Sequence, residues 1–237
     1  MAILNALPHS AILRFGLAIR TRFIDELLME AVTTRRIRTV LSVGCGLDTR
    51  PWRLDLPKDL RWIEVDFADM LDYKDRLMAS ETPRCRRERL AIDLNDPTQR
   101  RQLYEAAGTS SALMITEGLL LYLPAPTVEA LAADTRYNTG VTHWISDITT
   151  TAFHTAIGGG KDAMQSIRHV QASNCLSGDQ ILELLYRNGW ATDATRSYIT
   201  DIGFAADRIK RMTGGAPQAP VQFPPGDPTG VHRFVRQ

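Results

Sequence analysis

Hydrophobic positions recur along this chain with two different periods, and the changes of period predict its secondary structure. Apolar residues recur at helical spacing from Ile12 to Val32, in a region that is either one continuous helix or broken near Thr21. After it, short apolar and β-branched runs predict strands, and amphipathic stretches between them predict helices. The predicted strands are residues 39–44, 61–67, 89–94, the start of 112–123, and 142–148; the predicted helices are a turn around Pro51 and residues 68–78, 97–107 and 126–137. This alternation indicates an α/β fold with a doubly wound, mostly parallel sheet.

The regular alternation ends after the fifth predicted strand. Residues 149–176 contain the triple glycine Gly158–Gly160, and they predict a flexible insertion with a short helix, placed to form a lid. Residues 177–190 predict a helix capped by Ser177. The remaining segments predict a sixth strand, an exposed loop rich in proline and glycine, and an alternating edge strand at residues 191–198, 213–230 and 231–237, respectively.

Composition and charge narrow the class of protein. The chain has 237 residues, 44% of them hydrophobic and 23% charged, and no long linker, so we expect one domain over residues 1–237 with a helical cap at residues 1–38. A formal net charge of +1 gives no global field to attract nucleic acid or an anionic membrane. The basic run from Arg84 to Arg89 is a local exception, which we interpret as a solvated loop or a strand edge.

The cysteines bear on the cellular compartment. Cys45, Cys85 and Cys175 are far apart and odd in number, which argues against a disulfide framework and favours a reducing cytoplasm. No His/Cys cluster has the spacing of a zinc site, so no metal is expected. We see no signal-peptide pattern and no run near the roughly 18 apolar residues of a membrane helix. We therefore expect a cytoplasmic protein, with monomer and homodimer both open.

The segment "LSVGCGLDTRPW", residues 41–52, carries the most chemical information. Gly44 and Gly46 flank Cys45 at the end of the first predicted strand, where open α/β sheets bind their ligands. Glycines in such a turn allow a ligand to approach the backbone closely. Asp66 ends the second predicted strand, 22 residues after Gly44, which suits an acceptor for two ribose hydroxyls. The pattern predicts a cofactor that contains adenosine.

Asp48 bears on which adenosine cofactor this is. A dinucleotide would place its pyrophosphate near this carboxylate, and a like-charge contact at ~4 Å costs about 1 kcal/mol even in water. Arg50 could compensate, so a nicotinamide-dependent oxidoreductase stays open. S-adenosylmethionine has no phosphate and carries a sulfonium cation, so it tolerates a nearby acid. Asp48 could equally be a helix-start acid that interacts with the helix dipole.

Several segments together resemble the leucine carboxyl methyltransferase family. They are "LSVGCGLDTRPWRL", "WIEVDFADMLDYK", "AIDL" and "TEGLLLYLP", with "RTRFIDELL" (20–28) before the first strand. The resemblance covers roughly residues 14–137. It implies a fold like the class I methyltransferases, S-adenosylmethionine as cofactor, and methylation of oxygen, often of a carboxylate.

The resemblance also implies roles for individual residues. Gly44, Cys45 and Gly46 would form the cofactor loop, beside Asp48. Asp66 would bind the ribose hydroxyls. The other implied contacts are Asp93 and the Leu94 backbone at the adenine, Glu117 and Tyr122 near the methionine end of the cofactor, and Arg20 paired with the cofactor's carboxylate.

The expected reaction is in-line transfer of a methyl group to an acceptor oxygen. A carboxylate acceptor is already ionised at pH 7 and needs no general base, so the protein would align the reactants and exclude water. Tyr122, His154 and Arg168 are the positioning candidates, and an arginine in the cap suits a small, acidic acceptor. A hydroxyl acceptor would need a base, for which His154 and His169 are candidates. A cofactor-binding subunit without turnover is the non-enzymatic alternative. The region after the fifth strand is short for the family, which argues against a large protein substrate.

Overall fold

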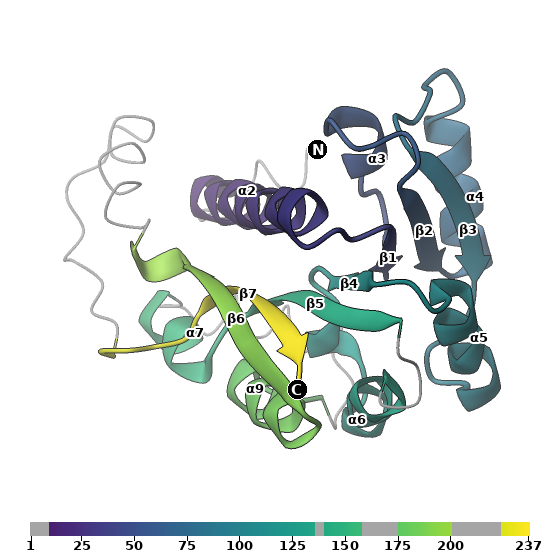
Figure 1. Ribbon diagram of the computed structural model, residues 1–237. Coiled ribbons are helices and arrows are strands. Elements are labelled where there is room, and N and C mark those ends of the chain that lie inside the picture. The colour runs from purple at the N-terminus through teal and green to yellow at the C-terminus, as the bar shows by residue number, and fades with distance from the viewer. Residues whose placement is uncertain (1–9, 136–139, 158–174, 201–223) are drawn as a thin grey trace.

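The computed structural model describes residues 10–135, 140–157, 175–200 and 224–237, and its centre is a seven-stranded sheet (Figure 1). The strands are β1 (Thr39–Val43), β2 (Arg61–Asp66), β3 (Arg86–Ala91), β4 (Ala112–Thr116), β5 (Val141–Ile148), β6 (Trp190–Ser197) and β7 (Gly230–Arg236). Their order in the sheet is β3-β2-β1-β4-β5-β7-β6. The first five strands pair in parallel, and β7 runs antiparallel to both of its neighbours. The prediction of a mostly parallel α/β sheet is confirmed.

Helices cover both faces of this sheet. Neighbouring residues of a strand point to opposite faces, so apolar side chains lie on both faces and pack against helices there. The helices are α2 (Ser10–Thr34), α3 (Arg50–Arg53), α4 (Ala68–Leu77), α5 (Pro97–Ala107), α6 (Ala125–Asp134), α7 (Thr151–Ile157) and α9 (Gly178–Arg187), with a 3₁₀ turn η1 (Leu120–Tyr122). Val40 packs with the apolar side chains of α2, whereas Leu41 packs with those of α5, α6 and α9. Two hydrophobic cores therefore enclose the sheet.

The N-terminal helix lies across the sheet (Figure 1). Phe23, Ile24, Leu27 and Leu28 recur at helical spacing and are buried against the strands, with no break near Thr21. The same helix also brings Arg20 to the carboxyl edge of the parallel strands, where it lies beside Gly118. Residues 1–38 as a cap and residues 1–237 as one domain stay predictions.

The C-terminal strand is not at the edge of the sheet, so that prediction was wrong. β7 lies between β5 and β6, and β6 is the edge strand. The alternating pattern of β7 shows that it is a strand whose side chains point to opposite faces. The pattern does not show which strands lie beside it, because tertiary packing decides that. Val231 and Phe234 point to opposite faces of the sheet, and each is fully buried in one of the two cores.

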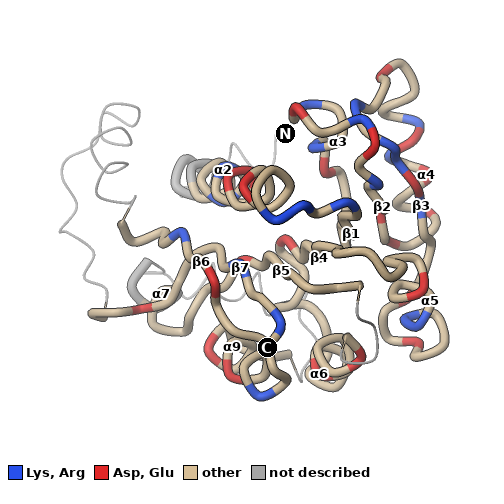
Figure 2. The backbone as a smooth tube through the Cα atoms, viewed as in Figure 1, with Lys and Arg blue, Asp and Glu red and all other residues tan. Residues whose placement is uncertain are grey.

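The third strand begins earlier than predicted, within the basic run. β3 starts at Arg86 and ends at Ala91, so Asp93 and Leu94 lie in the turn that follows it. Basic and acidic residues intermingle over α4, β2 and β3 (Figure 2). Arg87 pairs with the buried Glu64 of β2, and Arg89 pairs with acids of α4. These ion pairs allow a polar sequence to form an edge strand.

Parts of the predicted insertion lie outside the described residues. Its start forms α7, and the segment 158–174, which includes Arg168 and His169, is not described. His154 belongs to α7, but its side chain is also outside the described part. The predicted helix at 177–190 is confirmed as α9, and Ser177 forms a capping box with Gln180. Within the described residues, no helix is long and apolar enough to cross a membrane.

Candidate functional site

The glycine loop after β1 turns tightly at the carboxyl edge of the sheet. Gly44 and Gly46 both have left-handed backbone angles, with φ of +63° and +43°. The N–H groups of Gly44 and Cys45 donate to the carbonyl of Val65 at 2.8 and 3.1 Å. A Cβ on Gly44 would lie 2.8 Å from Leu119 Cδ1, so the loop requires glycine for its backbone angle and for close packing.

Asp66 supports this loop from the end of β2. Its Oδ2 accepts from the N–H of Gly46 and its Oδ1 accepts from the N–H of Phe67, both at 2.8 Å. Each carboxylate oxygen can accept a further hydrogen bond. Asp66 thus holds the loop in place and keeps acceptor capacity.

A pocket of about 350 Å³ opens beside the glycine loop. Its wall comes from the end of β1, the loop, α3, the middle of α2 and the residue after β4. The lining residues are Arg20, Thr21, Ser42, Val43, Gly44, Cys45, Gly46, Leu47, Asp48, Thr49, Arg50, Arg53 and Glu117. The structure thereby brings together the predicted residues Arg20, Gly44, Cys45, Gly46, Asp48 and Glu117. Burial raises the pKa of the Cys45 thiol to about 12, so this side chain is a neutral lining group and not a thiolate nucleophile.

Arg50 holds three carboxylates together beneath this pocket. Its Nε donates to Asp25 Oδ1 at 2.7 Å, and its Nη1 lies 2.7 Å from Glu117 Oε2 and 3.0 Å from Asp48 Oδ2. Asp48 Oδ1 also accepts from the Arg50 N–H at 2.9 Å. Only 2% of the Arg50 side chain is exposed. Burial alone lowers the pKa of Arg50, but the three carboxylates outweigh it and raise the pKa above its usual value.

Arg20 connects the same network to β5. Its Nε donates to Glu117 Oε1 at 3.0 Å, and its Nη1 donates to Asp147 Oδ2 at 3.2 Å. Asp147 also accepts from the N–H of Gly118 at 2.7 Å, and its burial raises the pKa of its carboxyl above the usual value. Nη2 of Arg20 makes no hydrogen bond within the described part of the chain. Because Arg20 lines the pocket, this nitrogen is a candidate donor to a ligand.

Among the described residues, the predicted Asp66, Asp93, Leu94 and Tyr122 do not line this pocket. Asp93 Oδ1 accepts from the N–H of Asn95. The Leu94 side chain is in the core, and its carbonyl accepts from Arg100 at 2.8 Å. Tyr122 lies in η1 and is 41% exposed. Asp93 and Leu94 follow β3, which is next to β2 and its Asp66, so they lie at the same edge of the sheet.

Sequence reasoning missed two residues of the network and undervalued a third. Asp25 and Asp147 were not predicted as site residues, and Arg50 was considered only as a compensating charge. Asp147 had a usable signal, since it stands near the end of a parallel strand as Asp66 does. Asp25 lies within "RTRFIDELL", five residues after Arg20, but nothing in a helical pattern shows which acid meets a distant arginine.

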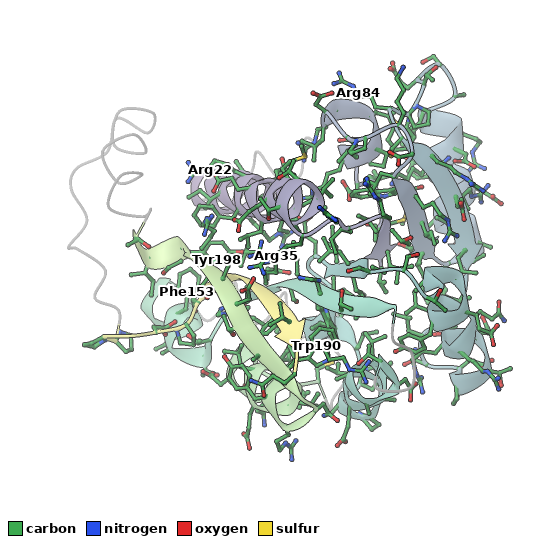
Figure 3. The ribbon with its side chains drawn as sticks, in the orientation of Figure 1. Arg22, Arg35, Arg84, Phe153, Trp190 and Tyr198 are labelled. Carbon is green, nitrogen blue, oxygen red and sulfur yellow. The ribbon has the colours of Figure 1, made fainter. Side chains whose placement is uncertain are left out.

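An aromatic cluster lies close to Arg20 and Asp147. Tyr198 stacks on Phe23 of α2, with ring centroids 5.9 Å apart. It also meets Phe153 of α7 at 6.2 Å, and Figure 3 labels both of these residues. The Tyr198 hydroxyl is buried and has no hydrogen-bond partner among the described residues. Among these residues there is also no group of three or more His, Cys, Asp or Glu side chains that could hold a metal ion.

A sequence model of the leucine carboxyl methyltransferase family matches residues 5–135, and this range includes every residue that lines the pocket. The chain belongs to this family. The resemblance found in the motifs is therefore confirmed over more than half of the chain, from α2 to the end of α6.

Curated relatives match about half of the chain. One from Streptomyces avermitilis is 39% identical over 124 residues, which are 50% of this chain and 43% of the relative. One from Frankia alni is 38% identical over 121 residues, 49% of this chain and 41% of the relative. Both are named "putative S-adenosyl-L-methionine-dependent methyltransferase". The match thus spans less than half the length of these relatives.

Solved structures resemble a larger part of the chain. A DUF574 family protein from Streptomyces avermitilis superposes with a TM-score of 0.59 at 11% identity, over 93% of this chain and 83% of the other. An O-methyltransferase family protein from Burkholderia thailandensis gives a TM-score of 0.53 at 11% identity, over 98% and 61%. At such low identity the likeness shows the fold, which is the fold of class I methyltransferases.

Proposed function

We propose that this protein is an S-adenosylmethionine-dependent O-methyltransferase that methylates a carboxylate of a small, acidic molecule and forms a methyl ester. The observation that carries the proposal is the pairing of Arg20 with Glu117 beside the glycine loop, which offers a cation and an anion in one pocket. The names of the curated relatives support the cofactor, and the family supports the oxygen acceptor.

The donors and acceptors of the pocket fit this cofactor. Its methionine end carries a carboxylate and an ammonium group, which suit Arg20 Nη2 and Glu117 respectively. Its ribose hydroxyls suit the remaining acceptor capacity of Asp66, which does not line the pocket itself but accepts from the N–H of Gly46 in its wall. A Cβ on Gly46 would meet no atom within 4 Å, so the backbone there is open to a ligand. Arg50 neutralises the charge of Asp48. A cofactor without a phosphate therefore needs no further residue of the pocket to balance that charge.

The chain's own residues would bind, orient and exclude water. When bound, the cofactor supplies a methyl group activated by its positive sulfur. Arg20, Glu117 and Asp66 would fix the orientation of that group, which lowers the entropic part of the barrier. A carboxylate acceptor would approach already ionised and would need no base. Tyr122, His154 and Arg168 stay the candidates that position the acceptor.

Calorimetric titration tests the cofactor. We expect the protein to bind S-adenosylmethionine and S-adenosylhomocysteine but not NAD. Glu117→Gln removes the negative charge that faces the ammonium group, so affinity should fall at least about tenfold. Glu129→Gln, on the exposed side of α6, is the matched control and should bind like wild type. Binding of NAD alone would instead favour the oxidoreductase alternative.

Transfer of a labelled methyl group tests the acceptor. The protein is incubated with methyl-labelled cofactor and a panel of small carboxylic acids and phenols, and the products are then treated with base. A methyl ester releases labelled methanol under base, whereas a methyl ether is stable. Base-stable product would overturn the carboxylate part of the proposal. Tight binding without transfer to any acceptor would favour a non-catalytic subunit.

A further inference from the structure

Arg50 has an unusual position for a charged side chain at a ligand pocket. It follows the glycine loop in the chain and borders the pocket, yet only 2% of its side chain is exposed. Burying a guanidinium costs several kcal/mol unless carboxylates surround it. Arg50 meets three of them, each from a different element: Asp25 of α2, Asp48 of the glycine loop, and Glu117 after β4. The buried charge of Arg50 thus joins these three elements.

Glu117 is the partner of Arg50 that also contacts Arg20. Arg50 holds its Oε2 at 2.7 Å, and Arg20 holds its Oε1 at 3.0 Å. The two arginines approach different oxygens of one carboxylate, so Glu117 is held between them while 21% of its side chain faces solvent. Without Arg50, the Glu117 carboxylate would keep Arg20 as its strong partner. An arginine favours a two-pronged contact with a carboxylate, so Arg20 and Glu117 would then bind each other through two hydrogen bonds.

Arg20 is affected by the same change. Its Nε binds Glu117 and its Nη1 binds Asp147, while Nη2 has no partner among the described residues. A two-pronged contact with a freed Glu117 would occupy more of the guanidinium edge. Both groups would then satisfy each other instead of a ligand.

We propose that Arg50 is a positioning residue that limits the contact between Arg20 and Glu117 to the one through Arg20 Nε, so that both stay available to the amino-acid end of the cofactor. Asp25 and Asp48 hold Arg50 itself in place. The inference rests on the proposed function and assigns a role to the third residue of the "DTR" sequence. It concerns only the part of the pocket that would meet an ammonium and a carboxylate.

Arg50→Lys tests this role with two ligands. Lysine keeps the charge but cannot replace a guanidinium that meets three carboxylates. S-adenosylhomocysteine has the amino-acid end, whereas methylthioadenosine has the adenosine and the sulfur without it. We expect Arg50→Lys to weaken S-adenosylhomocysteine about tenfold or more. Methylthioadenosine should stay within about twofold of wild type, because its contacts avoid Glu117 and Arg20.

Arg233→Lys is the matched control. Arg233 is also 2% exposed, and it also ties α2 to another element through Glu30 and Asp193, but it does not line the pocket. We expect this variant to lower the melting temperature and to leave the affinities for both ligands unchanged. It thereby separates loss of a buried ion pair from loss of ligand orientation.

The outcomes distinguish this inference from the proposed function. If wild-type protein binds neither ligand, the proposed function fails. If wild type binds both and Arg50→Lys weakens both equally or neither, Arg50 has a structural role only and the inference is overturned. If Arg50→Lys does not fold, Asp25→Asn replaces it, since it loosens Arg50 from the side away from Glu117. A selective loss of S-adenosylhomocysteine binding is then expected again, and an equal effect on both ligands again contradicts the inference.

Discussion

Asp48 lies against Arg50 instead of standing alone at the start of a helix. Its Oδ2 is 3.0 Å from Arg50 Nη1, and it also accepts from Ser42 at 3.3 Å. An ionised group inside the protein is stable only when such partners replace water. Asp48, the carboxylate that disfavours a pyrophosphate, is therefore one part of an ion network. It influences a ligand indirectly, because it holds Arg50 and Arg50 holds Glu117.

At this scale the sequence predicts residues that stand at fixed places in the chain. The glycines, Asp66 and Glu117 are predicted because they stand at or just after the ends of strands, and parallel strands place their ends at one edge. Asp147 also stands near the end of a parallel strand and has the same signal, whereas Asp25 lies within a helix and is recognised only by its arginine. Arg50 and Arg20 meet them only after α2 has packed on the sheet.

The two loop glycines differ in what an added methyl group would meet, which gives a residue-scale prediction. Both have positive φ, so Gly44→Ala and Gly46→Ala should each cost about 1–2 kcal/mol in unfolding free energy. Gly44→Ala should cost more, since its Cβ would lie 2.8 Å from Leu119 Cδ1. Gly46→Ala points its methyl group into open space beside the pocket and should weaken S-adenosylhomocysteine. Urea denaturation and calorimetry measure the two effects; wild-type affinity in Gly46→Ala would contradict the placement of the ligand.

At the scale of elements, the sequence predicts strands and helices better than their neighbours in the sheet. β1 and β4 are buried apolar runs of the kind expected in a parallel sheet, so their pattern is clear. β3 is polar, and acids of β2 and α4 stabilise it; of the two interpretations of its basic run, a solvated loop or a strand edge, the structure shows the strand edge. β7 was misplaced at the edge because alternation does not show which strands flank it. The order of strands is a property of the packed sheet and is not local.

The start of α9 gives a prediction at this scale. The Ser177 hydroxyl accepts from the Gln180 N–H at 3.4 Å, and Gln180 Oε1 accepts from the Ser177 N–H at 2.9 Å. Ser177→Ala should lower the unfolding free energy by about 1 kcal/mol, because it leaves an N–H of the first turn without its partner. Thr33→Ala, at the exposed end of α2, is the control and should change stability by less than about 0.5 kcal/mol.

A double-mutant cycle shows whether the two hydrogen bonds act together. Ser177→Ala and Gln180→Ala remove the two halves of one capping box, so their effects should be less than additive. Strict additivity, measured by urea denaturation of the single and double variants, would mean that the box does not form in solution.

At the scale of the whole molecule, the part of the chain beyond the family match contributes a residue to the ion network of the candidate site. The match ends at residue 135, but Asp147 of β5 binds both Arg20 and the N–H of Gly118. Tyr198, also beyond the match, stacks on Phe23 of α2 and meets Phe153 of α7. Residues inside and beyond the family match thus both contact α2. A ligand that orders Arg20 should therefore also stabilise β5 and its neighbours.

Acid pH should destabilise the molecule through carboxylates that are paired in the folded state. The clearest case within the described residues is Glu88 of β3, where hydrogen bonding to Arg61 of β2 lowers the pKa of the carboxyl. Its pKa in the folded state is below that of the unfolded chain. The stabilisation is therefore fully present above the unfolded value and is lost as the pH falls through the folded value.

Glu88→Gln isolates this contribution. The variant should be less stable than wild type at pH 7 by about 0.5 kcal/mol, the usual size for a partly exposed pair. The difference should shrink as the pH falls below about 4.3, the ordinary value for glutamate, and should vanish once Glu88 is protonated in both states. Urea denaturation between pH 7 and pH 3 measures the curve. Glu129→Gln should run parallel to wild type, and a Glu88→Gln curve that did the same would show that the Arg61–Glu88 pair does not stabilise the β2–β3 edge.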